Sequence, residues 1–131
     1  MNGSMYNGLF LSGKPHGFGC FHWLNGDIYT GQWGNGGVKH GSGSWKGGNG
    51  DEYLGEWKDG SADGYGIHKW LNGDRYEGEF KRSFKHGKGM EKFANGDRYL
   101  GDYQNGKPCG NGDYTWAHGS QYKGQFYNGL R

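Results

Sequence analysis

A 23-residue repeat constrains the fold of this chain more than any other feature. The unit 53–75 reads YLGEWKDGSADGYGIHKWLNGDR, and the same template recurs before and after it. One unit has an extra residue, in a loop between Gly36 and Gly41. A fixed period this short predicts an array of one small supersecondary unit. The unit boundaries are 6–28, 29–52, 53–75, 76–98 and 99–121, followed by a truncated unit at 122–131.

Each unit carries two strand patterns. In the third unit Tyr53, Gly55 and Trp57 alternate with polar or exposed positions, which is the period of two that is typical of a strand. A second alternating run covers 64–71 after a loop that holds Gly60. Asn72-Gly73 then closes the unit, and Asn-Gly between two strand patterns is a strong hairpin signal because both residues tolerate positive φ. The pattern predicts one β-hairpin per unit, with Asn-Gly turns joining the hairpins.

The expected fold is all-β: an elongated, twisted, single-layer antiparallel sheet of stacked β-hairpin repeats. An isolated hairpin is marginal in water, so the units must stack. Hydrophobic residues are only 31% of the chain and glycines number 31, so aromatic rings must supply the buried apolar area. We expect Gly55 and Gly66 to leave room for neighbouring rings. On the second face, repeated acidic and lysine positions such as Glu56 and Lys69 are expected to form cross-strand charge pairs.

The aromatic face is the first candidate binding surface. Its rings recur in two rows along the array, and a single sheet layer cannot bury all of them. We expect part of this face to remain an open groove, which suits an apolar or helical peptide. The alternative is that the rings only pack on one another and on glycine. The candidate partner-groove residues are Tyr29, Trp33, Tyr53, Trp57, Tyr76, Phe80, Tyr99 and Tyr103.

The loops within the hairpins form the second candidate surface. They carry a summed formal charge of +5, whereas the Asn-Gly-type turns at the opposite edge carry −3. The basic charge is concentrated at Lys81, Arg82 and Lys85. Each basic residue near an anionic lipid surface gains about 1 kcal/mol, so these three residues are the candidate lipid or anion site. An ordinary solvated loop is the alternative.

Little in the chain indicates catalysis or metal binding. His16, His40 and His86 occupy one repeated position, so they lie about 10 Å apart and cannot share a metal ion. No serine or cysteine has a base placed near it by the pattern, and we expect no catalytic residue, metal or cofactor. Net charge is +2, too small to indicate nucleic-acid binding. Cys20 and Cys109 fall in the first and fifth units, too far apart for a disulfide, which favours a cytoplasmic compartment.

The repeated pattern Y-x-G-x-W/F-x-x-G-x-x-x-G-x-G followed by N-G-D resembles the MORN repeat (membrane occupation and recognition nexus). The resemblance covers almost the whole chain, with small departures at Ser83 and at His118-Gly119-Ser120. It implies an elongated sheet of stacked hairpins. It also implies a non-catalytic scaffold or tether, because such arrays occur in junctophilins, plant phosphatidylinositol phosphate kinases, axonemal proteins and protozoan cytoskeletal scaffolds.

Three functional hypotheses follow. The first is a scaffold that presents the aromatic groove to a protein partner, at a junction of membrane and cytoskeleton. The second is a module that binds phosphoinositides or other anionic phospholipids, and the third is the regulatory region of a larger enzyme such as a lipid kinase. Neither end reads as a cap, with residues 2–5 resembling the tail of a preceding unit, so we expect a segment of a longer protein. Its open ends could pair with a second copy as a homodimer.

Overall fold

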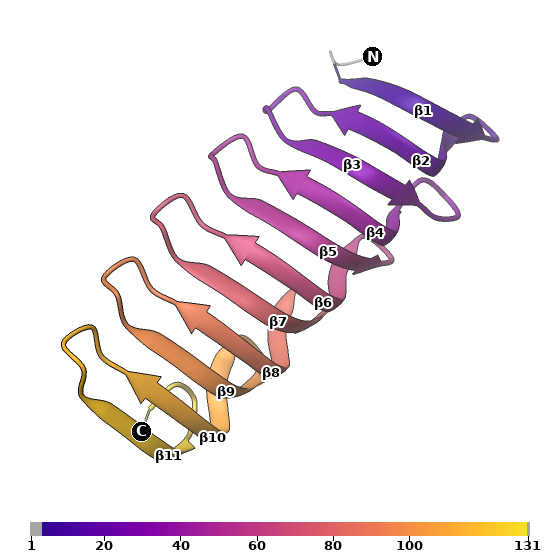
Figure 1. Ribbon diagram of the computed structural model, residues 1–131. Helices are drawn as coiled ribbons and strands as arrows, with labels where there is room; N and C mark the ends of the chain where they lie inside the picture. The colour runs from indigo at the N-terminus through magenta and orange to yellow at the C-terminus, as the bar shows by residue number, and fades with distance from the viewer. Residues whose placement is uncertain (1–3, 131) are drawn as a thin grey trace.

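The computed structural model describes residues 4–130, which form one open antiparallel sheet of eleven strands in chain order (Figure 1). Each strand therefore pairs only with its neighbours in sequence, and residues 4–130 contain no helix. The expected all-β array of stacked hairpins is confirmed. The strands are β1 (Met5–Leu11), β2 (Lys14–His22), β3 (Ile28–Trp33), β4 (Lys39–Lys46), β5 (Glu52–Lys58), β6 (Ser61–Lys69), β7 (Arg75–Lys81), β8 (Phe84–Lys92), β9 (Arg98–Gln104), β10 (Lys107–Thr115) and β11 (Gln121–Phe126).

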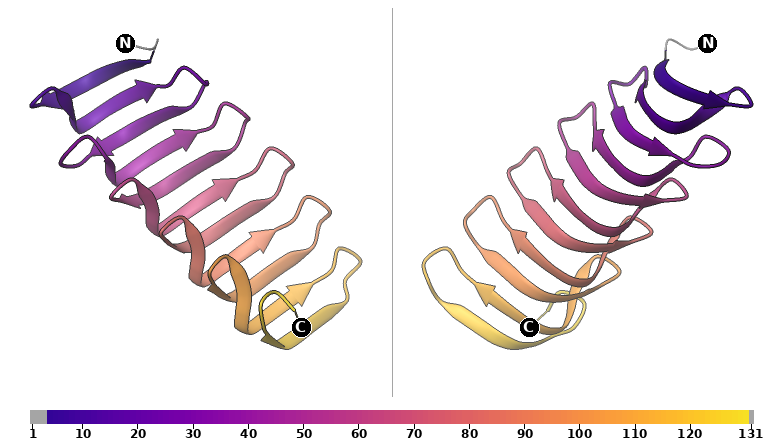
Figure 2. Two further views of the ribbon diagram at one scale, coloured as in Figure 1. Left: turned by 180° about the vertical axis from the view of Figure 1, so that it is seen from behind. Right: turned by 45° about the vertical axis from the view of Figure 1, so that its right-hand side comes forward.

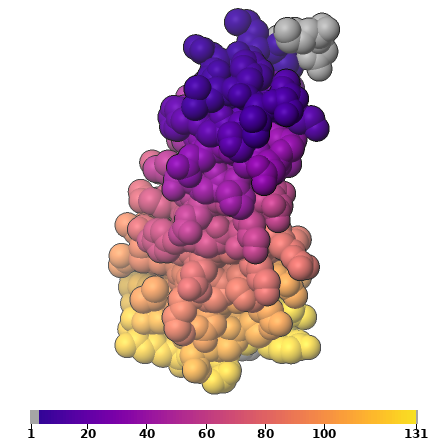
Figure 3. Space-filling model, turned by 90° about the vertical axis from the view of Figure 1, so that its right-hand side faces the viewer, coloured from indigo at the N-terminus to yellow at the C-terminus, as the bar shows by residue number. Residues whose placement is uncertain are grey.

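The array is elongated, and its first and last strands lie at opposite ends (Figures 1 and 3). Every strand bends along its length, so the sheet forms an open trough (Figure 2). The bend coincides with a β-bulge in each hairpin. In the third hairpin the pairing shifts between Gly55 and Trp57, and Gly64 on the partner strand has a φ of 98°. Such bulges bend a strand and increase its twist, which explains the trough.

The two kinds of turn differ from the expectation. Within the third hairpin Asp59 and Gly60 both have positive φ, at 51° and 85°, as a tight two-residue turn requires. At the Asn-Gly connection only Gly73 has a positive φ, and Asn72 accepts the Asp74 backbone N–H at 2.9 Å. Asn-Gly therefore forms the expected turn between hairpins, but this turn has one positive φ value instead of the two of a tight Asn-Gly turn. Since the tight turn is so short, β6 begins at Ser61 rather than at the expected residue 64.

Each repeat packs a tyrosine across a pair of glycines. Gly55 lies directly opposite Gly66, and the Tyr53 ring covers both. The Tyr53 hydroxyl donates to the backbone carbonyl of Glu56 at 2.8 Å. A Cβ at Gly66 would collide with that hydroxyl oxygen. The glycines leave room for an aromatic ring, as expected, but the expectation of a ring from a neighbouring repeat was wrong, because Tyr53 belongs to the same repeat.

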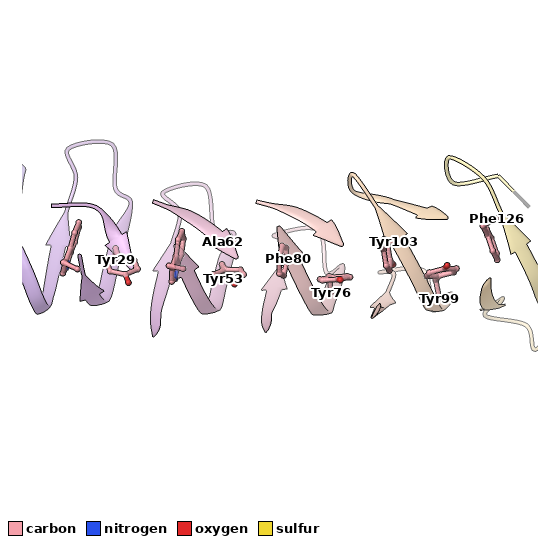
Figure 4. Close-up of a cluster of buried hydrophobic side chains, with 10 residues drawn as sticks. Tyr29, Tyr53, Ala62, Tyr76, Phe80, Tyr99, Tyr103 and Phe126 are labelled. Atoms are coloured by element: carbon pink, nitrogen blue, oxygen red, sulfur yellow. The ribbon is translucent and has the colours of Figure 1, made fainter. Parts of the chain in front are cut away.

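A continuous ladder of rings joins one repeat to the next (Figure 4). Tyr53 meets Trp57 of its own repeat and Phe80 of the following repeat, with ring centroids 4.9 and 5.1 Å apart and planes nearly perpendicular. Edge-to-face contacts of this kind recur along the array and are favourable beyond the area they bury. In addition, the Trp57 indole N–H donates to the Gly43 carbonyl of the preceding repeat at 3.1 Å. These contacts connect each repeat to the next along the array.

The Asn-Gly-Asp connections add a second link between repeats. One carboxylate oxygen of Asp74 accepts the backbone N–H of Ala94, in the next connection, at 2.7 Å. Asp27, Asp51 and Asp97 make the same bond to the connection that follows each of them. The aspartates are thus both turn formers and ties between neighbouring repeats.

The outer, convex face departs from the expected charge pairing. Among residues 4–130, Lys46 forms an ion pair with Glu52 at 3.8 Å, whereas Lys69 and Lys92 form none. Glu56 instead accepts the backbone N–H of Tyr65 at 3.1 Å, next to the bulge. Within residues 4–130, Lys69 and Lys92 therefore lack the predicted cross-strand pair, whereas Asp102 pairs with Lys88 of the neighbouring strand. Glu79 and Asp102 also accept backbone N–H groups beside their bulges, as Glu56 does.

Candidate functional site

The eight candidate groove residues form the packed floor of the trough. All of them are at most 9% exposed, and Tyr29, Tyr76 and Tyr99 are fully buried. They come from β3, β5, β7 and β9, which are the first strands of four successive hairpins. The six of them that Figure 4 labels follow one another in a row along the array. A partner lying in the trough would therefore contact mainly the side chains that cover this floor, and the floor rings only where they line a hollow, as Tyr53 and Tyr99 do.

A second row of aromatic residues covers the floor and remains half-buried. It comes from the second strands and the residues just after them, and the candidate groove residues did not include it. The period-two pattern contained the signal, because it placed His68 and Trp70 on the same face as Gly66. The members of this upper row are Phe21, Trp23, Trp45, Trp70, Phe93, Tyr114 and Trp116.

Three hollows follow one another along the trough. The first, about 420 Å³, lies at the first repeat between Phe10 and Trp23. The second, about 300 Å³, is bounded by Lys39, Trp45 and His68 and lies over floor rings of the third and fourth repeats. The third, about 460 Å³, lies near the last strands and includes Lys85 and Glu91. The concave face is thus a segmented groove with apolar walls and a few charged groups.

Lys85 lies inside this groove. Its ammonium lies over the rings of Trp70, Tyr76 and Tyr103, at 4.8, 5.6 and 5.8 Å from their centroids. Its Nζ is 3.0 Å from Glu91 Oε1, and the Tyr103 hydroxyl donates to the same oxygen at 2.8 Å. Burial and the Glu91 carboxylate raise the Tyr103 pKa well above its usual range, so the phenol stays protonated as the donor.

Lys39 occupies the equivalent position two repeats earlier. Its ammonium lies over Trp23, Tyr29 and Trp57, with centroids 5.0, 5.8 and 5.3 Å away. Within residues 4–130 Lys39 forms no ion pair, in contrast to Lys85. Burial lowers the Lys39 pKa, and the charge of Asp27 opposes that shift in part.

His68 forms part of the wall between these two lysines. Its ring stacks on Trp70 with centroids 4.1 Å apart and planes 8° from parallel. Burial and the nearby positive charge of Lys85 lower the His68 pKa, so the imidazole is neutral at pH 7. The buried Nε2 atom has no hydrogen-bond partner within the described chain. This residue adds a flat, uncharged surface to the groove.

The three candidate lipid-site residues do not form one cluster. Lys81 and Arg82 are exposed at the tip of the β7–β8 turn, where the Arg82 backbone N–H contacts an Asp63 carboxylate oxygen at 3.5 Å. Lys85 is the second residue of β8, and its side chain turns into the groove, where it is only 18% exposed. The expected loop 81–86 is a two-residue turn, and this shortening separates Lys85 from the other two cations.

Residues 4–130 offer no metal site, because no group of three or more His, Cys, Asp or Glu side chains in that range could hold an ion. Cys20 and Cys109 are both free thiols, on strands β2 and β10. The same range contains no helix that is long and apolar enough to span a membrane.

A curved sheet of stacked hairpins with an accessible aromatic trough defines a repeat protein of the interaction-module class. The chain belongs to the MORN repeat family, whose profile matches residues 6–28, 53–75, 76–98, 99–121 and 122–131. The second repeat, 29–52, lies outside the match and contains the longer β3–β4 loop. No curated protein sequence matches the chain. MORN repeats mediate contacts with proteins and membranes, so this chain is a repeat interaction module.

Proposed function

We propose that this module is a non-catalytic scaffold or tether that holds an apolar or helical segment of a partner protein in its concave face. The observation that supports it best is the row of three hollows between half-buried aromatic residues. Aromatic side chains in preformed pockets are the residues that most often dominate binding energy at protein interfaces. The floor beneath them is already packed, so the array loses little conformational freedom on binding.

The test is a selection of helical peptides from a displayed library on the folded protein, followed by affinity measurements. A concave variant carries Trp45→Gln and Phe93→Gln, which remove two rings that line the hollows. A matched convex variant carries Leu54→Gln and Leu100→Gln, two side chains that are each 58% exposed on the opposite face. All substitutions are neutral, so differences report on apolar contact alone.

We expect the concave variant to bind selected peptides at least about tenfold more weakly, which corresponds to ~1.4 kcal/mol. The convex variant should bind as the unchanged protein does, and both variants should retain the β-sheet circular dichroism spectrum. Loss of binding in the convex variant instead would contradict the proposal. So would a folded protein from which no peptide can be selected.

Binding to anionic phospholipid is a second candidate, because Lys81 and Arg82 are exposed at a hairpin tip. Two cations at about 1 kcal/mol each make a weak, salt-sensitive contact. Sedimentation with phosphoinositide-containing liposomes at low and high salt tests it, with Lys81→Glu and Arg82→Glu as the variant. Binding that survives both the charge reversal and high salt would exclude this tip as the lipid site. A regulatory role within a larger enzyme is compatible with either surface.

A further inference from the structure

Repeats two and four build the same lysine site with one difference. Lys39 and Lys85 have the same register, each lying opposite the second ring of its own hairpin, Trp33 or Phe80. The rings around the two ammonium groups also correspond one to one by position in the repeat. They are Trp23, Tyr29 and Trp57 for Lys39, and Trp70, Tyr76 and Tyr103 for Lys85.

The difference is the carboxylate. Glu91 lies between Tyr76 and Tyr99 in the register, and it neutralises Lys85 at 3.0 Å. Trp45 has the same register in the second repeat, between Tyr29 and Tyr53, and it brings no charge to Lys39. The fourth repeat therefore supplies its lysine with a carboxylate, and the second repeat does not.

An unpaired ammonium in this position favours an anionic ligand. Lys39 and Trp45 line the 300 Å³ hollow, whose other walls include His68 and Ala62. A carboxylate near Lys39 would gain a charge-assisted bond in a partly dehydrated site, where such bonds are stronger than in water. The flat rings of Trp45 and His68 can take the apolar part of the same ligand.

We infer that the hollow around Lys39 is a carboxylate-binding site, which receives an aspartate or glutamate side chain of the partner segment lying in the trough. This inference rests on the proposed function and makes it more specific: the partner carries an acidic residue among apolar ones. The ligand carboxylate pairs with Lys39 over the second repeat as Glu91 pairs with Lys85 over the fourth. Only one of the two lysine sites is open to a ligand, so the site also sets the position of the partner along the groove.

The first experiment uses a pair of small probes, phenylacetate and its neutral analogue phenylacetamide. The indole N–H signals of Trp23 and Trp57 are followed by NMR during titration of the folded protein. We expect saturable shifts with phenylacetate and binding at least about tenfold weaker with phenylacetamide, because only the charged probe can pair with Lys39. Equal binding of both probes would overturn the inference.

Two variants locate the site. Lys39→Met keeps most of the side-chain stem and removes the charge, so phenylacetate binding should be lost. Trp45→Glu places a carboxylate at the register position of Glu91, and it should block the probe by pairing with Lys39. Undiminished phenylacetate binding in the folded Lys39→Met protein would refute the site.

A gain-of-function variant gives an independent check. Glu91→Ala removes the internal carboxylate of the fourth repeat, and the vacated space should accept phenylacetate, with a shift of the Trp70 indole signal. If this variant is unfolded without ligand, restoration of the folded spectrum by phenylacetate but not phenylacetamide serves as the readout. A folded Glu91→Ala protein that ignores both probes would contradict the equivalence of the two sites.

The peptide selection separates the two proposals. Selected peptides that bind the Lys39→Met protein unchanged, yet lose binding to the Trp45→Gln and Phe93→Gln variant, would leave the groove function standing and reject the carboxylate site. Phenylacetate binding to a folded protein from which no peptide can be selected would reject the groove function and leave the carboxylate-binding hollow standing. If both hold, replacing the acidic residue of a selected peptide by its amide should weaken binding to the unchanged protein and not to Lys39→Met.

Discussion

The Lys85 ammonium lies 3.0 Å from the Glu91 carboxylate within the concave face, where the two side chains are only 18% and 8% exposed. Ion pairs with so little access to water are rarely strong stabilisers, but removing one member leaves the other charge without a partner. Here Glu91 also accepts the hydroxyl of Tyr103, so two side chains from successive repeats, Lys85 and Tyr103, depend on one carboxylate. Loss of the Glu91 carboxylate would therefore leave both the Lys85 ammonium and the Tyr103 hydroxyl without this partner.

Removing that carboxylate should be costly. We expect Glu91→Leu to lower the free energy of unfolding by about 3 kcal/mol, because Lys85 is left unpaired among aromatic rings. The double variant Lys85→Met with Glu91→Leu should lose less than Glu91→Leu alone. Chemical denaturation of both single variants and the double variant measures the coupling. A double variant that loses the sum of the two single losses would show that the pair is not coupled.

Filling the glycine beneath a tyrosine should disrupt one repeat. Gly66→Ala puts a methyl group against the Tyr53 hydroxyl and should cost about 1–3 kcal/mol of stability through overpacking. Gly60→Ala is the matched control, because a methyl group at Gly60 would meet no atom within 4 Å. The only cost in this variant is the strain of an alanine at a φ of 85°. Thermal unfolding should therefore place Gly66→Ala well below Gly60→Ala. The reverse order would argue against the ring-on-glycine packing.

Breaking one aspartate tie should loosen the link between two repeats. Asp74→Ala removes the acceptor of the Ala94 N–H, and we expect a loss of about 1.5–3 kcal/mol, the usual contribution of a hydrogen bond to a charged group. Hydrogen exchange at Ala94 should accelerate in the same variant. Ser120→Ala provides the control, because Ser120 stands at this position in the fifth repeat and its hydroxyl contacts only His118 among residues 4–130. Unchanged protection at Ala94 would contradict the proposed tie.

The buried tyrosines should make the fold sensitive to alkali. Burial raises the pKa of Tyr29 and of Tyr99 to about 12, above the value near 10 of an unfolded chain. A raised folded pKa means that the full stability is present below about pH 10 and is lost as pH rises towards 12. Near pH 11 each of these tyrosines should cost about 1.4 kcal/mol. Tyrosinate absorbance should appear together with loss of the β-sheet spectrum, and ionisation of all ten tyrosines near pH 10 without unfolding would disprove this coupling.

The sequence alone was sufficient to predict the hairpin unit, the all-β array and the role of the paired glycines. These features are local and repeated, so each copy of the pattern adds to the signal of the others. A period of two also placed Tyr53 and Trp57 on one face correctly. Patterns of this kind predict which face a side chain occupies, but not how deeply its ring is covered.

Only the tertiary structure decided which aromatic residues are floor and which are wall. A bulge bends each hairpin, and in the third it lies at Gly64. Trp57 thereby reaches the preceding repeat, where its indole N–H donates to the Gly43 carbonyl, and its side chain is buried. The same bend turns Lys85 away from the Lys81 tip and into the groove, although the three basic residues are adjacent in sequence. Sequence reasoning missed the difference between Lys39 and Lys85 for a related reason. It depends on whether Glu91 or Trp45 lies at one register position, and that contact forms only when the strands are paired and bent.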